Sequence, residues 1–401
     1  MVNVAILGFG VVGSGVADLL TKNVSEVSEL GGDSINIKYI LDLRDFPDSP
    51  FGDKVIHDFS VILADEEIDT VIEVMGGSHP AYEYTVASLS AGKNVITSNK
   101  EVVANFGDEF LALAEKYGVC YRFEAAVGGG IPVLSPIIHC VRQNRITEVR
   151  GILNGTTNYI LTKMFTFGES FEVALKDAQE RGFAERNPDA DILGTDASRK
   201  IAILAALVSG KLIPTDKIHT EGITGVRHED VVASEKIGRK IKLLGRCIKD
   251  GESLTVMVAP FMLTSDMPLA TVSGVYNAIE VVGEPVKNVM FYGPGAGAGP
   301  TASAVVGDLM EIMRSGNKYA VPSMTKFDGA RDFSEFESAS YIAMTGVCPM
   351  CVKSAFGEVQ HIETEGECAF VTSVMSERET EKAIKELTDK GGVLKSRIRL
   401  I

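Results

Sequence analysis

The first twenty residues carry the feature that most constrains the fold, three glycines between an apolar strand and a helix. Residues 2–7 read VNVAIL, and Gly8, Gly10 and Gly13 follow in the spacing G-x-G-x-x-G. In dinucleotide-binding folds these glycines permit a tight turn, a close backbone approach to a pyrophosphate, and close packing of helix on strand. The helix N-terminus adds N–H donors and a partial positive charge. The motif therefore predicts a dinucleotide-binding loop formed by Gly8, Phe9, Gly10, Val11, Val12 and Gly13.

Alternating strands and helices continue to about residue 130. We expect strands at 35–43, 70–77, 94–100 and 119–130, and helices at 81–93 and 101–118. This order predicts a Rossmann-type, doubly wound parallel sheet with its ligand at the carboxyl ends of the strands. Gly76, Ser98 and Lys100 fall at that edge. A solvated turn is the alternative for each of them, but their convergence on one edge favours a binding site.

The type of dinucleotide is left open by the residues after the second strand. An acid at this point favours NAD, whereas a basic side chain favours the 2′-phosphate of NADP. Arg44 stands here among Asp42, Asp45 and Asp48. Arg44 favours NADP, and the surrounding acids favour NAD.

A second concentration of polar residues lies in the middle of the chain, where the segment 189–200 (DADILGTDASRK) precedes the apolar run 201–208. Asp196 and Lys200 are four residues apart on one helix face, and an exposed ion pair worth about 0.2–0.5 kcal/mol is the ordinary interpretation. However, the side chain of Lys200 projects from a helix that is apolar on nearly every face. Glu185, Asp191 and Asp196 would repel one another without a cation. A substrate bearing an ammonium group would balance them, and a buried lysine suits proton transfer because burial lowers its pKa.

Composition narrows the class of protein. The chain has 401 residues, enough for two or three domains, and a net charge of −15. Such an acidic chain is not expected to bind nucleic acid or an anionic membrane. No apolar run reaches the ~18 residues of a membrane span. Cys348 and Cys351 form the one C-x-x-C, without a second pair to complete a zinc site. We expect a cytoplasmic protein with reduced thiols.

Seven segments together resemble homoserine dehydrogenase, over residues 1 to about 320. In chain order they are GFGVVG, SNK, EAAVGGG, GILNGTTNYIL, DADILGTDASRKIAIL, EGI and YGPGAGAGPTASAVVGD. The resemblance implies NAD(P)H-dependent reduction of L-aspartate 4-semialdehyde to L-homoserine, a step toward threonine, methionine and isoleucine.

The resemblance also implies roles for individual residues. Lys200 corresponds to the proton donor, and Lys100 to a second essential lysine beside substrate and nicotinamide. Residues implied to hold the substrate are Glu185, Asp191, Asp196, Gly155 and Thr156, and those implied near the cofactor include Gly182, Glu185 and Gly297. A sodium ion is implied at the side chain of Glu124 and the backbone carbonyls of Val127, Gly129 and Ile131. Oxygen ligands with a single carboxylate suit a hard monovalent cation. From the residues alone, this glycine-rich segment could equally be an interdomain hinge.

These patterns predict four parts of the chain. They are a nucleotide-binding unit of residues 1–136 and about 293–320, an α+β substrate-binding and dimerisation domain at 137–292, a linker at 321–336, and a tail at 337–401. The tail has the βαββαβ order of an ACT domain but lacks that domain's D-x-P-G-V-L segment. Binding of threonine and a purely structural role are both open for it. We expect a homodimer or a homotetramer.

Two other functions remain possible at this stage. One is a different Rossmann-fold dehydrogenase of amino-acid metabolism. The other is a non-enzymatic, NADP-sensing regulator with an ACT-like tail, which would not need the Asp196 and Lys200 pair.

Overall fold

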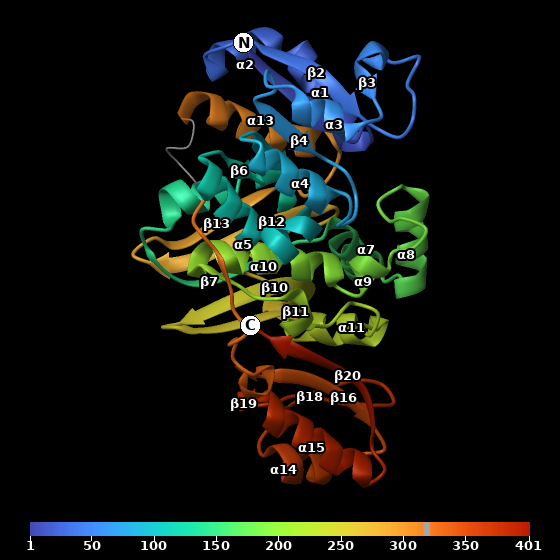
Figure 1. Ribbon diagram of the computed structural model, residues 1–401. Coiled ribbons are helices and arrows are strands. Elements are labelled where there is room, and N and C mark those ends of the chain that lie inside the picture. The colour runs from blue at the N-terminus through green and yellow to red at the C-terminus, as the bar shows by residue number, and fades with distance from the viewer. Residues whose placement is uncertain (316–320) are drawn as a thin grey trace.

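The computed structural model describes residues 1–315 and 321–401. The last five residues of the segment expected to complete the nucleotide-binding unit, 316–320, lie outside the described residues. Figure 1 shows three parts in a row: a sheet with helices at the N-terminal end, a mixed middle part, and the tail. No helix in the described ranges is long and apolar enough to cross a membrane.

The first sheet is the predicted Rossmann-type sheet, with six parallel strands in the order β3-β2-β1-β4-β5-β6. The strands are β1 (Val2–Leu7), β2 (Ile35–Leu41), β3 (Val55–Ile56), β4 (Thr70–Glu73), β5 (Asn94–Thr97) and β6 (Tyr121–Arg122). The short β3 was not predicted. The strand expected at 119–130 was too long, because the chain leaves the sheet after Arg122 and turns through Gly128 and Gly129, both with positive φ.

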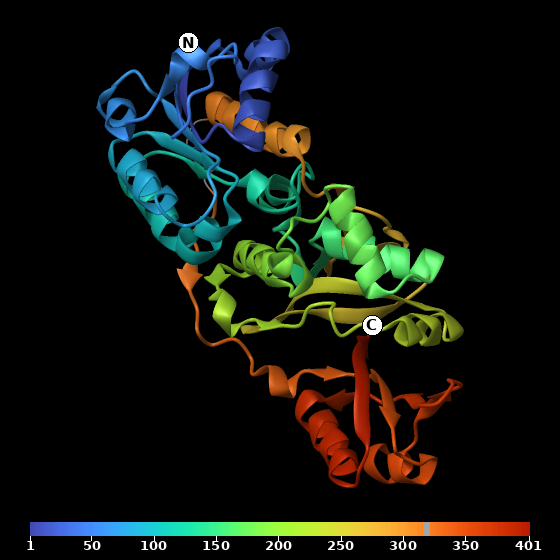
Figure 2. The ribbon, with the colours of Figure 1, turned by 90° about the vertical axis from the view of Figure 1, so that its right-hand side faces the viewer.

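Helices cover both faces of this sheet, as a parallel sheet requires. They are α1 (Val11–Lys22), α2 (Val24–Gly31), α3 (Phe59–Ala64), α4 (Ala81–Ser90), α5 (Lys100–Tyr117) and α13 (Ala298–Ser315). Residues of β1 alternate between the faces: Val4 and Ile6 pack with α1 and α13, whereas Ala5 and Leu7 pack toward the α4 and α5 side. Although α13 is remote in sequence, it lies beside α1 (Figure 2).

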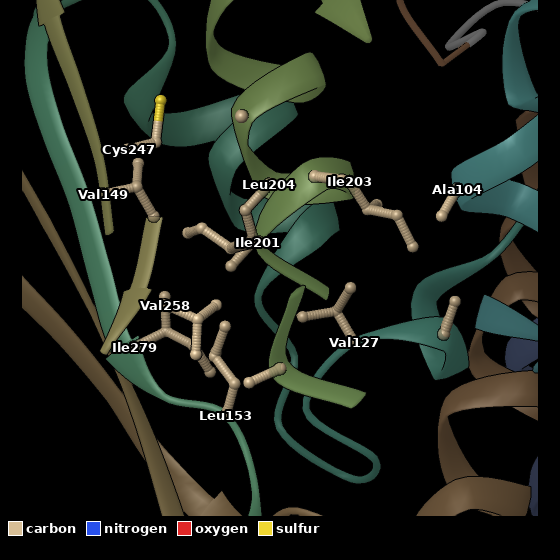
Figure 3. Packing of buried hydrophobic residues seen from close by; sticks show 14 of the residues in the cluster. Ala104, Val127, Val149, Leu153, Ile201, Ile203, Leu204, Cys247, Val258 and Ile279 are labelled. Carbon is tan, nitrogen blue, oxygen red and sulfur yellow. The ribbon is translucent and has the colours of Figure 1, made fainter. Parts of the chain in front are cut away.

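The middle part is built on a largely antiparallel sheet in the order β13-β12-β7-β10-β11. Its strands are β7 (Arg145–Ile152), β10 (Arg239–Asp250), β11 (Ser253–Thr264), β12 (Tyr276–Glu284) and β13 (Lys287–Pro294). Its helices are α6 (Leu134–Pro136), α7 (Gly155–Phe167), α8 (Phe171–Glu180), α9 (Asp189–Ile192), α10 (Thr195–Ser209), α11 (His228–Lys236) and α12 (Pro268–Thr271). The apolar helix α10 lies on this sheet, with Ile201 and Leu204 directed toward its strands (Figure 3).

The tail has the predicted βαββαβ order. It contains β16 (Ser340–Thr345), α14 (Pro349–Phe356), β17 (Gln360–Ile362), β18 (Cys368–Val371), α15 (Glu377–Asp389) and β20 (Val393–Leu400), with the small pair β15 (Glu337–Ser338) and β19 (Met375–Ser376). Strand β20 also pairs with β11, so the tail sheet continues the middle sheet. Within the segment expected as a linker, β14 (Thr325–Lys326) pairs with β8 (Lys211–Leu212). A further short strand, β9 (His219–Thr220), pairs with β11.

Candidate active site

The glycine loop lies at the mouth of a cleft of about 480 Å³. Gly8 has a φ of 96°, and a Cβ on Gly13 would stand 2.0 Å from the carbonyl oxygen of Gly8, so both positions require glycine. Of the predicted cofactor residues, Gly8, Gly10, Arg44 and Gly76 line the cleft. Val11 is exposed beside them, whereas Phe9 is buried in the core and Val12 packs against it.

Asp42, at the end of β2, joins the glycine loop to Arg44. Its carboxylate accepts the Phe9 N–H at 2.8 Å and bonds from Arg44 Nε and Nη2 at 3.0 and 3.2 Å. The hydrogen bond from Arg44 lowers the pKa of Asp42 to about 2. His57, which sequence reasoning missed, lines the same cleft, and its Nδ1 lies 2.7 Å from the Asp42 carbonyl oxygen. This end of the cleft therefore carries the Asp42 carboxylate, the Arg44 guanidinium and the His57 imidazole.

The carboxyl ends of β4 and β5 form the floor of the site. Glu73 is fully buried; it accepts the Thr97 hydroxyl at 2.6 Å and the Met75 N–H at 2.8 Å, and burial raises its pKa to about 7. Asn99 caps α5 through the N–H groups of residues 101 and 102 and donates to the Gly77 carbonyl at 2.7 Å. Since this cap starts α5 at Lys100, it fixes that lysine at the cofactor edge.

Lys100 reaches across from the first sheet to the middle part, where it forms an ion pair with Asp196. The other oxygen of Asp196 accepts a hydrogen bond from Lys200 Nζ at 2.7 Å, and Lys200 also donates to the Leu153 carbonyl at 2.8 Å. Asp196 and Lys200 are buried, whereas the Lys100 side chain is 38% exposed. The solvated ion pair considered for Asp196 and Lys200 is therefore wrong.

Asn154 completes this cluster, although it is not among the site residues predicted from the sequence. Its side-chain NH₂ donates to Asp191 at 2.7 Å and to Asp196 at 2.9 Å, while its oxygen caps α7 at the Thr157 N–H. A run of polar residues at a helix start was the available signal, but such a run is also what ordinary capping produces.

The environment sets opposite protonation tendencies on these groups. Burial raises the pKa of Asp191, with a further contribution from Asp196. Burial also acts against the charged form of Asp196, but Lys200 and Lys100 outweigh it and hold its pKa well below the usual range. For Lys200, burial dominates and lowers the pKa. The site thus holds one firmly ionised carboxylate beside a lysine that releases its proton more readily than usual.

Other predicted substrate and cofactor residues lie around the cluster. Thr156 donates to the Phe183 carbonyl at 2.6 Å, and a Cβ on Gly155 would stand 2.6 Å from the Val275 carbonyl oxygen. Glu185 is exposed on the loop after α8, and among the described residues its side chain forms no ion pair. Gly182 and Gly297 are exposed with positive φ. Arg199 pairs with Glu101 of α5 at 3.0 Å.

The predicted sodium residues lie on the buried loop after β6. Both oxygens of Glu124 accept backbone N–H groups, from Val133, Leu134 and Ser135 at 2.7–2.8 Å. The carboxylate is thus already bound to the loop that follows. The backbone carbonyls of Val127, Gly129 and Ile131 accept no hydrogen bond in the described part of the chain, although these residues are buried. Carbonyl oxygens of this kind fit a hard monovalent cation.

A dinucleotide-binding sheet whose ligand edge faces a buried aspartate–lysine pair defines an NAD(P)-dependent oxidoreductase. Comparison with known proteins gives the family. The family models described as "Homoserine dehydrogenase, NAD binding domain" and "Homoserine dehydrogenase" match residues 8–124 and 132–310. The chain belongs to the homoserine dehydrogenase family, whose members oxidise or form a CH–OH group.

Individual relatives agree with this assignment. The chain is 38% identical to homoserine dehydrogenase of Bacillus subtilis over 81% of its own length and 77% of the relative, and 40% identical to that of Synechocystis over 78% and 73%. It is similar to the crystal structure of a homoserine dehydrogenase from Thiobacillus denitrificans, with a TM-score of 0.92, 32% identity and coverage of 100% and 98%. The S. aureus enzyme gives a TM-score of 0.84 at 30% identity, with the same coverage.

Proposed function

We propose that this protein reduces L-aspartate 4-semialdehyde to L-homoserine with NADPH or NADH, and that Lys200 protonates the substrate oxygen. The observation that carries the proposal is the Lys100–Asp196–Lys200 cluster, which lies where the cofactor edge of the first sheet meets the middle part. A nicotinamide bound at this edge would supply the hydride for the aldehyde carbon. The side chains of the cluster bind the substrate and supply the proton.

Lys200 has the bonding capacity that this role needs. An ammonium group has three N–H donors, and two of them are used by Asp196 and the Leu153 carbonyl. The third is available to the substrate oxygen. Because burial lowers the pKa of Lys200, its proton is released more readily to a developing alkoxide than that of an exposed lysine.

The three carboxylates of the proposed site have different roles. Asp196 already holds two lysines and the Asn154 amide, so its role is to orient the lysines. Asp191 forms no ion pair among the described residues, and burial disfavours its charged form. We assign the substrate ammonium to Asp191, because a cation there would offset the cost of that burial. Glu185, on the neighbouring exposed loop, is the second acid proposed to contact substrate and cofactor.

Three further assignments belong to the same proposal. A sodium ion held by the carbonyls of Val127, Gly129 and Ile131 would fix the loop that joins β6 to the middle part. The stacked rings of Tyr276 and Tyr292, both largely exposed on β12 and β13, support association into a homodimer or a homotetramer. None of the six cysteines, all in the described part of the chain, forms a disulfide, which fits a cytoplasmic enzyme.

The test is NADPH and NADH oxidation with aspartate semialdehyde, for the unsubstituted chain, Lys200→Ala and Lys100→Ala. Loss of a positioned proton donor should lower kcat by about 10²–10⁴-fold. The Kd of the cofactor, measured by nicotinamide fluorescence, should stay nearly unchanged. Near-normal turnover by Lys200→Ala would remove the proton-donor assignment, and no turnover by the unsubstituted chain with either cofactor would refute the function.

A further inference from the structure

An arginine of the tail reaches the middle part close to the substrate site. Arg399, on β20, is 2% exposed. Its Nη1 and Nη2 donate to the two carboxylate oxygens of Glu221 at 2.8 and 2.9 Å, and its Nε and Nη2 donate to Glu377 of α15 at 2.8 Å. The guanidinium therefore joins a tail helix to a loop of the middle part with paired, charge-assisted bonds, the strongest class of side-chain hydrogen bond.

The loop that carries Glu221 is held from several sides. The Glu221 N–H donates to the Val258 carbonyl of β11 at 2.8 Å, and its side chain accepts from His219 at 2.6 Å. The His219 ring stacks on Phe333, which lies just before the tail, with ring centroids 3.5 Å apart. The backbone and the carboxylate of Glu221 are thus both bound, while 36% of the side chain remains exposed.

Directly against this loop lies the backbone between Asp191 and Asp196. A Cβ on Gly222 would stand 2.0 Å from the Ile192 carbonyl oxygen, and the Ile223 N–H donates to that same oxygen at 2.8 Å. On the other side, a Cβ on Gly194 would stand 3.4 Å from the Glu221 carbonyl oxygen. Ile192 directly follows Asp191, and Gly194 lies two positions before Asp196. A shift of the Glu221 loop must therefore displace the segment that carries both carboxylates, since close-packed backbone cannot absorb it.

We propose that Glu221, clamped by Arg399 of the tail, is a positioning residue for the reaction that sets where Asp191 and Asp196 stand. This inference rests on the function proposed above, because it takes those two carboxylates as the groups that hold the substrate and Lys200. In this proposal the tail supports the substrate site indirectly, through the ion pair between Arg399 and Glu221, and its residues do not contact substrate or cofactor. The cofactor cleft lies on the first sheet and does not depend on the clamp.

The experiment compares Glu221→Gln with Glu367→Gln in the full-length protein. Glu367 makes the other bidentate contact between tail and middle part, with Arg227 at 3.0 and 3.1 Å, and it is also well buried. The same isosteric substitution thus weakens the same interface without loosening the Asp191–Asp196 segment. Glu221→Gln should raise KM for aspartate semialdehyde about tenfold and lower kcat, since a misplacement of about 1 Å can cost about 10²-fold in rate. The Kd for NADPH should stay within about twofold, and Glu367→Gln should keep the KM and kcat of the unsubstituted chain.

A second variant keeps the test decisive if Glu221→Gln does not fold. Arg399→Lys retains the charge and the contact with Glu377 but cannot bridge both carboxylates, so it should raise KM in the same way. The inference alone is refuted if the unsubstituted chain is active and both Glu221→Gln and Arg399→Lys keep its KM, or if Glu367→Gln shifts KM equally. Absence of activity in the unsubstituted chain refutes the proposed function, and the inference with it.

Discussion

Replacing Asp196 by asparagine tests the electrostatic basis of the site. The substitution keeps the shape of the side chain and removes the charge that lies 2.7 Å from Lys200 Nζ and in an ion pair with Lys100. Lys200 would then retain the Leu153 carbonyl and a neutral amide in a buried environment. Because burial already lowers its pKa, loss of the Asp196 charge should lower it further.

The size of the effect follows from the burial of the two ion pairs. Breaking a buried pair costs about 3–5 kcal/mol when the remaining charge stays ionised. Lys200 escapes part of this cost by losing its proton, while the partly exposed Lys100 regains water and contributes about 1 kcal/mol or less. We therefore expect a loss of about 2–4 kcal/mol in the free energy of unfolding. We expect a fall of about 10²–10⁴-fold in kcat for reduction at neutral pH, because the lysine no longer carries the proton it must donate.

The assay is kcat for semialdehyde reduction as a function of pH, with urea denaturation beside it. The donor must be protonated, so activity is lost as pH rises through its pKa, and this loss should begin at lower pH in Asp196→Asn. Activity relative to the unsubstituted chain should recover as pH is lowered. Arg199→Gln is the matched control, because it removes another ion pair between α10 and α5 without touching Lys200. An Asp196→Asn enzyme with the kcat and alkaline limb of the unsubstituted chain would refute the reasoning.

Three further predictions concern the surroundings of this cluster. Glu73 has a pKa of about 7 in the folded chain against 4.5 in the unfolded one, so its neutral form favours folding. That contribution is complete below pH 4.5 and lost as pH rises through 7; relative to Glu73→Gln, urea melts should show a loss of about 3 kcal/mol. Asn154→Ala removes a helix cap and the donor shared by Asp191 and Asp196, and should cost about 1 kcal/mol in urea melts and raise KM for the semialdehyde; an unchanged KM would contradict the bridging role. Arg44→Ser should raise KM for NADPH about tenfold and leave KM for NADH unchanged, and equal effects on both would show that Arg44 does not face the 2′-phosphate.

Much of the fold could be predicted because it is encoded locally. The short apolar run of β1, the glycine spacing after it and the apolar helix α10 are visible in short windows of sequence. The tail order was likewise predictable from alternating apolar runs. The two-residue strand β3 was not, and the end of β6 was placed too late, since such short strands exist through pairing with neighbours and carry no period of their own.

The residue types of the candidate site could be predicted from the sequence, but the hydrogen bonds and ion pairs between them could not. The sequence predicts Asp196 and Lys200 on one helix face, and the burial of both residues excludes the exposed ion pair. The donation from Asn154 to two carboxylates and the contact from Arg399 to Glu221 join residues 37 to 178 positions apart. Such contacts depend on how the domains pack, which no local pattern encodes. The loop of Glu185 is exposed, and within the described residues the Glu185 side chain forms no hydrogen bond or ion pair that would indicate its role.

The difference in exposure between the two lysines supports our assignment of Lys200, rather than Lys100, as the proton donor. Asp196 lies between them and keeps its charge with either one. The Lys200 side chain is 9% exposed and that of Lys100 is 38% exposed, so desolvation disfavours the charged form of Lys200 far more. When one proton leaves the cluster, the least costly outcome is a neutral amine at the buried Lys200 and an ammonium at the more exposed Lys100. Lys100 then remains to balance Asp196, and the carboxylate is never left alone in the interior.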